Sequence, residues 1–124
     1  MMQVLAIAAG GAIGAVLRYG MSNGVYALFG RSFPYGTLAV NVLGSLLMGL
    51  LFVIFLERIT LDVTWRAAIL VGGLGAFTTF STFSIETLNL LEEGQPGLAI
   101  LNALLSVVLC VGATWLGVII ARQI

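Results

Sequence analysis

Long apolar stretches, separated by short polar segments, make up almost the whole chain. They predict membrane-spanning helices over about residues 4–29, 35–56, 65–91 and 97–121. An α-helix needs roughly 20 residues to cross the hydrocarbon core of a bilayer, and each stretch is long enough. Pro34 precedes the second stretch, where it suits a helix start. We therefore expect an all-α membrane protein in which residues 1–124 form a single domain of four spans.

The second and fourth spans each carry a row of polar residues at helical spacing. The row on the second span is Thr37, Asn41 and Ser45, and that on the fourth is Asn102, Ser106 and Cys110. A carboxamide in mid-membrane is costly unless it bonds a neighbouring helix or a passing ion. Asn41 is therefore expected either to hold two helices together or to line a pore, and the pattern alone does not choose.

The third span has the most unusual composition, between Gly72 and Glu86. Three glycines in four residues are poor helix formers, and five hydroxyl residues and three phenylalanines follow them. Within a membrane this predicts an interrupted helix with a polar seam, because irregular backbone at that depth must be enclosed by protein or line a wet path.

A helix drawn from Thr78 to Glu86 places Thr78, Thr82 and Glu86 in a single row. Phe80 and Phe83 flank this row. Any one of these residues is consistent with packing alone, whereas their coincidence favours an ion pathway.

Composition excludes several other functions. The chain is 60% hydrophobic, only 8% charged and of zero net charge, so it offers no basic tract for nucleic acid. It has no histidine and one cysteine, which argues against a histidine proton relay, a cysteine-rich metal site and a disulfide scaffold. No nucleophile–base pair is evident, so an enzyme is not expected. The N-terminus lacks a basic region before the first apolar run, so we expect this run to remain as a span.

The arginines give little orientation signal. With four spans, Arg58, Arg66 and Arg122 lie on the side of the termini, whereas Arg31 lies on the other side, with Arg18 if it is near that interface. Orientation follows the Lys and Arg bias, and here the bias is about one charge. This predicts a dual-topology protein that pairs as an antiparallel homodimer in the lipid bilayer. For Arg18 itself, interfacial anchoring is favoured over an anion-attracting vestibule.

The polar seams favour a path for a small anion. Glu86 is the single carboxylate within the seams, whereas a cation path usually carries several. An anion path needs hydrogen-bond donors without a deep electrostatic trap, because the ion must also leave. The edges of aromatic rings carry partial positive charge, so stacked Phe80 and Phe83 could accommodate such an ion.

Three segments resemble the Fluc/CrcB fluoride channels, and the similarity extends over nearly the whole chain. They are Gly14–Arg18, Gly36–Gly44 and Gly72–Thr87, of which the last is the most specific. The resemblance implies dual-topology, antiparallel homodimers of four-helix subunits with two fluoride pathways. It also implies passive fluoride export across the bacterial inner membrane, which lowers intracellular fluoride and its toxicity.

The resemblance also assigns roles to individual residues. Phe80 and Phe83 would form a ring box with their counterparts in the second subunit, and Asn41 would be a donor to the ion. Further pathway residues would be Thr37, Ser81, Thr82, Glu86 and, on the fourth span, Ser106. Arg18 matches the family's arginine near the end of the first span. A structural sodium ion at the dimer centre would bind the backbone carbonyls of Gly75 and Thr78.

Two other functions remain as alternatives. A small multidrug-resistance-like, proton-coupled exporter of small cations is also a short four-span dimer, but it carries a glutamate within the first span, and residues 4–17 contain no carboxylate. A structural membrane subunit without transport of its own is the second alternative.

Overall fold

The structure is a computed structural model of residues 1–124, and it contains helices only. Four of them are long and apolar enough to cross a membrane, at Met2–Phe29, Tyr35–Arg58, Val63–Glu92 and Pro96–Gln123. The prediction of four apolar spans is thereby confirmed. Each bound lies within two residues of the range expected from the sequence. By the length and composition of these helices, the chain is a multi-pass membrane protein.

The first and last spans are single α-helices, α1 (Met2–Phe29) and α6 (Pro96–Gln123). The second span consists of α2 (Tyr35–Val53) and a π-helical turn, η1 (Ile54–Arg58). The third is the most divided and consists of α3 (Val63–Arg66), π-helical η2 (Ala67–Leu74), α4 (Gly75–Phe77) and α5 (Phe80–Glu92). The η2–α4 boundary lies within the glycine-rich segment, where helix propensity is lowest, and the α4–α5 interruption comes shortly after it.

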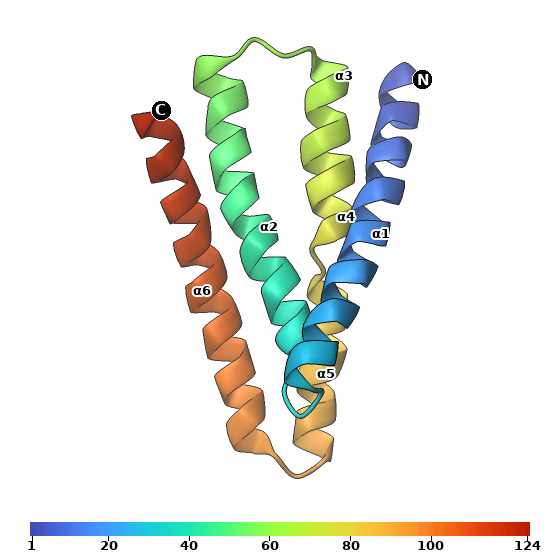
Figure 1. Ribbon diagram of the computed structural model, residues 1–124, viewed down its shortest axis with the longest axis vertical. Coiled ribbons are helices and arrows are strands. Elements are labelled where there is room, and N and C mark those ends of the chain that lie inside the picture. Colours follow the sequence, from blue (N-terminus) through green and yellow to red (C-terminus); the bar gives the residue numbers. More distant parts are fainter.

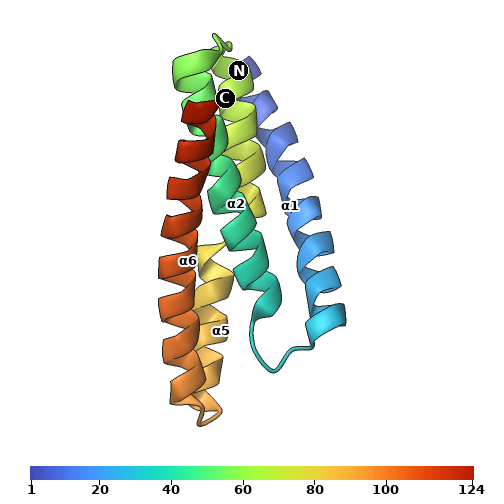
Figure 2. The same cartoon turned by 60° about the vertical axis from the view of Figure 1, so that its left-hand side comes forward.

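Both termini and the connection between η1 and α3 lie at one end of the molecule (Figure 1). The α1–α2 and α5–α6 connections lie towards the opposite end. Along the bundle, α2 packs against α6, and α1 packs against η2 and α4. Figure 2 shows α5 beside the first half of α6, so the third and fourth spans also meet.

Glycines allow these helices to approach closely. A Cβ atom at Gly14 of α1 would overlap the Gly73 carbonyl oxygen of η2, and one at Gly49 of α2 would overlap the Thr114 carbonyl oxygen of α6. Without these side chains the backbones come into direct contact, as in other membrane helices with small interfacial residues. The two pairings hold the first span to the third and the second span to the fourth.

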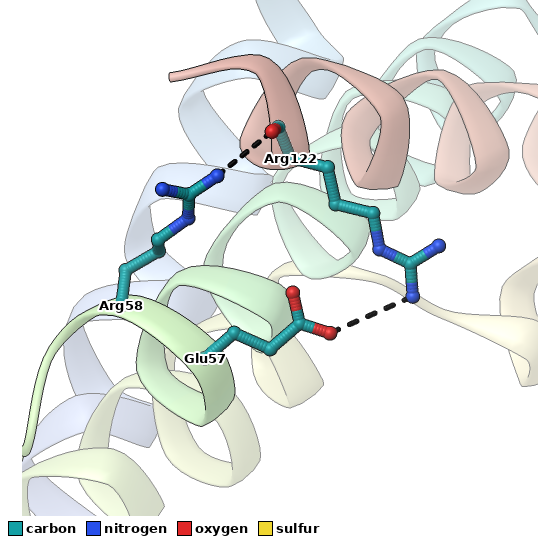
Figure 3. A network of polar contacts seen from close by, with 3 residues as sticks. All are labelled: Glu57, Arg58 and Arg122. Carbon is teal, nitrogen blue, oxygen red and sulfur yellow. Dashed lines mark hydrogen bonds and ion pairs between the residues drawn. The ribbon is translucent and has the colours of Figure 1, made fainter.

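A polar network at the terminal end joins α6 to η1 (Figure 3). The Arg58 guanidinium donates to the Arg122 carbonyl oxygen at 2.7 Å, and the Arg122 guanidinium lies 3.6 Å from a Glu57 carboxylate oxygen. These groups are solvent-exposed, so the ion pair is worth little by itself.

The outer surface of the chain is largely apolar. Only 21 of the 124 residues are buried, and large side chains such as Trp115 and Val111 are exposed on α6. Such a surface suits lipid tails or another apolar protein surface.

Candidate functional site

Two residues of the third span, Thr78 and Thr79, have extended backbone between α4 and α5. Thr78 has φ −95° and ψ 161°, and Thr79 has φ −154° and ψ 117°. The expectation that one helix runs from Thr78 to Glu86 is therefore wrong for these two residues, because α5 begins only at Phe80. Thr78 consequently does not belong to a helical row with Thr82 and Glu86.

Asn41 of α2 replaces the helical hydrogen bonds of Thr79. Its Nδ2 donates to the Thr79 carbonyl oxygen at 3.0 Å, and its Oδ1 accepts from the Thr79 amide at 2.8 Å. One carboxamide thus satisfies both backbone groups of a residue outside any helix, as partly buried backbone requires. Asn41 has the helix-joining role that the sequence left open, and it also lines the cleft described below.

Backbone carbonyls lose their usual donors at the same place, among them those of Gly75 and Thr78. In a continuous helix the Thr79 amide would donate to Gly75 and the Thr82 amide to Thr78. Here the Thr79 amide donates to Asn41, and the Thr82 amide donates to the Thr79 hydroxyl at 3.1 Å. The carbonyl oxygens of Gly75 and Thr78 are therefore left without helical donors.

Arg18 lies beside this interruption. Its Nε donates to the carbonyl oxygen of Ala76 at 2.9 Å, and α1 continues for eleven residues to Phe29. The structure places the Arg18 side chain against the third span, and its role as an interfacial anchor stays a prediction. Its guanidinium satisfies a carbonyl group that a continuous helix would satisfy internally.

A cleft of about 370 Å³ opens between α2, α5 and α6, beside Thr78 and Thr79. It brings together two residues from each of the polar rows of the second and fourth spans, which the sequence predicts separately. The lining includes Asn41, Ser45, Thr78, Thr79, Phe80, Phe83, Ser106, Cys110 and Thr114. We refer to it below as the central cleft.

The ring pair and one unpartnered hydroxyl stand out in this lining. The centroids of Phe80 and Phe83 lie 5.3 Å apart, and their planes are tilted by 41°. Phe80 is 78% exposed, so its ring is free to meet a further surface. The Ser106 Oγ is buried and has no hydrogen-bond partner. Its hydroxyl is therefore available to a molecule or ion in the central cleft.

Four of the predicted pathway residues, Thr37, Ser81, Thr82 and Glu86, lie outside the lining of the central cleft. Thr37 is buried, while Ser81 is exposed on α5, with its hydroxyl 3.3 Å from that of Thr79. The Thr82 hydroxyl accepts from the Thr79 hydroxyl at 3.1 Å, within the N-terminal cap of α5.

Glu86 lies in a second cleft of about 350 Å³, near the α1–α2 and α5–α6 connections. The Tyr26 hydroxyl donates to Glu86 Oε2 at 2.7 Å and lies 3.4 Å from the Thr37 hydroxyl. We call this space, which Arg31 also lines, the mouth cleft. The sequence gives no sign of this role for Tyr26, because one tyrosine near the end of an apolar helix looks like an interfacial anchor.

Comparisons with known proteins bear on this arrangement. A family model described as "CrcB-like protein, Camphor Resistance (CrcB)" matches residues 5–118. The chain belongs to the CrcB family. The resemblance inferred from the three sequence segments is thus confirmed.

Similar CrcB-family proteins include three that are named "Fluoride-specific ion channel FluC". Those of Magnetococcus marinus and Coxiella burnetii are 58% and 55% identical to the chain, over 123 and 124 residues. Each alignment covers 99% of the chain and all of the relative. That of Geobacter sulfurreducens is 52% identical over 124 residues and the full length of both. The family is one of ion channels and not of enzymes, as the sequence predicted.

Proposed function

We propose that the chain is a fluoride-selective channel that exports cytoplasmic fluoride passively, down its electrochemical gradient. The observation that carries the proposal is the central cleft, in which neutral donors lie beside the Phe80–Phe83 ring pair. Its support from outside the chain is the naming of full-length relatives as fluoride-specific channels.

The donors of the central cleft suit a small anion that has lost part of its water. A carboxamide has two N–H groups, and Asn41 uses one for Thr79, so the other is left for an ion. The unpartnered Ser106 hydroxyl is a second donor. Ring edges add weak positive potential. No arginine lines the central cleft, so an anion would meet no deep electrostatic trap.

We further propose that the working unit is an antiparallel homodimer with two pathways. Phe80 and the central cleft are open to the surface of a single chain, so a second copy could complete a ring box and enclose the ion. The nearly balanced arginines support insertion in both orientations.

A structural sodium ion at the dimer centre fits the backbone of the third span. The carbonyl oxygens of Gly75 and Thr78 lack helical donors, and oxygen atoms are the ligands that hard cations take. Two from each subunit would provide four around a twofold axis. Purification without sodium should weaken the dimer slowly, measured by cross-linking over days. A dimer that forms equally well with sodium absent throughout would contradict this site.

Passive fluoride export suits a cell with an inside-negative potential. Hydrogen fluoride crosses membranes as a neutral molecule, and the anion is trapped where the cytoplasm is more alkaline. An open anion path then lets the potential expel fluoride, with about 2.3 kcal/mol per charge per 100 mV. This role places the channel in the bacterial inner membrane.

The test is ion efflux from liposomes that contain only this protein. Potassium-loaded vesicles with valinomycin are compared for fluoride and chloride release, with protein-free vesicles as the control. Rapid fluoride release with negligible chloride release is expected. Absence of release would refute the channel, and proton-coupled uptake of organic cations would support the exporter alternative.

A further inference from the structure

We propose that Tyr26 is a positioning residue of the pathway, which holds the Glu86 carboxylate at the junction between the central cleft and the mouth cleft. The inference rests on the proposed fluoride flux. It adds a residue of the first span to a pathway otherwise formed by the other three.

The contacts of Glu86 make it dependent on Tyr26. The Tyr26 hydroxyl donates to Oε2 at 2.7 Å, a short hydrogen bond of the kind that charged acceptors form. The other oxygen, Oε1, is buried and has no partner. Tyr26 therefore provides the one side-chain hydrogen bond that Glu86 makes, and Tyr26 is itself only 8% exposed.

The position of this contact links the two clefts. Glu86 follows Phe83 by about one turn of α5, or roughly 4.5 Å along the helix axis. Phe83 lines the central cleft, whereas Glu86 lines the mouth cleft. On α2, Thr37 lies one turn before Asn41, and its hydroxyl is 3.4 Å from that of Tyr26. Residues of the two clefts therefore lie one turn apart on α5, and the proposed path runs between the clefts at this group of side chains.

A carboxylate at such a junction opposes an anion unless its charge is held and compensated. The Tyr26 hydroxyl fixes one oxygen, and the Arg31 guanidinium carbon lies 4.4 Å from the centroid of the Tyr26 ring, which brings positive charge to the mouth cleft. Removal of the hydroxyl leaves both carboxylate oxygens without a donor. The side chain is then free to turn towards the path, so fluoride should meet an uncompensated negative charge.

The experiment measures fluoride efflux for the wild-type protein, Tyr26→Phe, Glu86→Gln and the double variant. Tyr19→Phe is the matched control, because Tyr19 is 72% exposed on the same helix and makes no hydrogen bond through its hydroxyl. Tyr26→Phe should slow efflux roughly tenfold, as expected for the loss of a charge-assisted hydrogen bond. In the Glu86→Gln background the same change should have less than about a twofold effect, since no charge remains to be compensated.

A merely structural role for Tyr26 predicts that Tyr26→Phe slows efflux equally in the wild-type and Glu86→Gln backgrounds, and this result would overturn the inference. Unchanged efflux in Tyr26→Phe would overturn it as well. If Tyr26→Phe does not assemble, the infrared difference spectrum between the wild-type protein and Glu86→Gln tests the hydrogen bond instead, because it isolates the Glu86 carboxylate band. A Glu86 carboxylate band shifted from that of solvated glutamate supports the hydrogen bond, and an unshifted band refutes it. Wild-type vesicles without fluoride efflux would instead refute the proposed function.

Discussion

Replacement of Asn41 by leucine tests whether a side chain from α2 stabilises the extended residues of the third span. Leucine has the same number and branching of side-chain heavy atoms but cannot pair with the Thr79 amide and carbonyl, which Asn41 binds at 2.8 and 3.0 Å. The substitution therefore removes two interhelical hydrogen bonds without creating a large cavity.

The expected loss in the free energy of unfolding follows from the number of hydrogen bonds that the substitution removes. Interhelical hydrogen bonds in membrane proteins average about 0.6 kcal/mol and reach about 1.7 kcal/mol. Two bonds to the backbone of one residue therefore predict a loss of roughly 1–3 kcal/mol in the free energy of unfolding. Asn102→Leu should cost about half as much, because the structure gives the Asn102 side chain a single bond, to the Thr87 hydroxyl at 2.9 Å.

The assay is reversible unfolding in mixed micelles with increasing SDS, followed by tryptophan fluorescence. Asn89→Leu is the control, because Asn89 is exposed and its side chain makes no hydrogen bond in the structure. The reasoning fails if Asn41→Leu unfolds at the same SDS fraction as Asn89→Leu. It also fails if the costs of Asn41→Leu and Asn102→Leu are equal.

Other substitutions test the rings, the packing and the surface network. Phe80→Ile and Phe83→Ile should sharply reduce fluoride efflux while the dimer remains assembled, and normal efflux in both would exclude a ring box. Gly14→Ala should destabilise the protein by at least about 1 kcal/mol in SDS titration, because its Cβ would overlap backbone. Gly112→Ala, where nothing lies within 4 Å of the added Cβ, should be neutral or stabilising. Glu57→Gln should change stability by less than about 0.5 kcal/mol, since the ion pair it removes is exposed.

Helix positions and polar rows were predictable because both are local, periodic features. Apolar length defines a span, and a spacing of four residues places Asn41 and Ser45 on one face. The rows on the second and fourth spans do meet, since both contribute to the central cleft. The rows meet because α2 packs against α6, and glycines such as Gly49 and Gly117 allow this close packing. The glycines alone do not indicate in the sequence which two helices pack together.

The missed features depend on contacts between residues far apart in the chain. Tyr26 reaches Glu86 across 60 positions, and Arg18 reaches Ala76 across 58. Hydropathy describes Tyr26 and Arg18 only as residues of one long apolar helix. Nothing in their local spacing indicates a partner on another helix.

The extended conformation of Thr78 and Thr79 shows how a glycine-rich segment and a distant asparagine act together. Low helix propensity reduces the free energy lost when the helix is interrupted. The interruption nevertheless leaves the Thr79 amide and carbonyl in an apolar environment, where unpaired polar groups are costly. Asn41 satisfies both groups, and this same pairing leaves the Gly75 carbonyl without its donor. The two roles left open for Asn41 are therefore compatible, because the side chain that joins the helices also lines the central cleft and has a second N–H that Thr79 does not use.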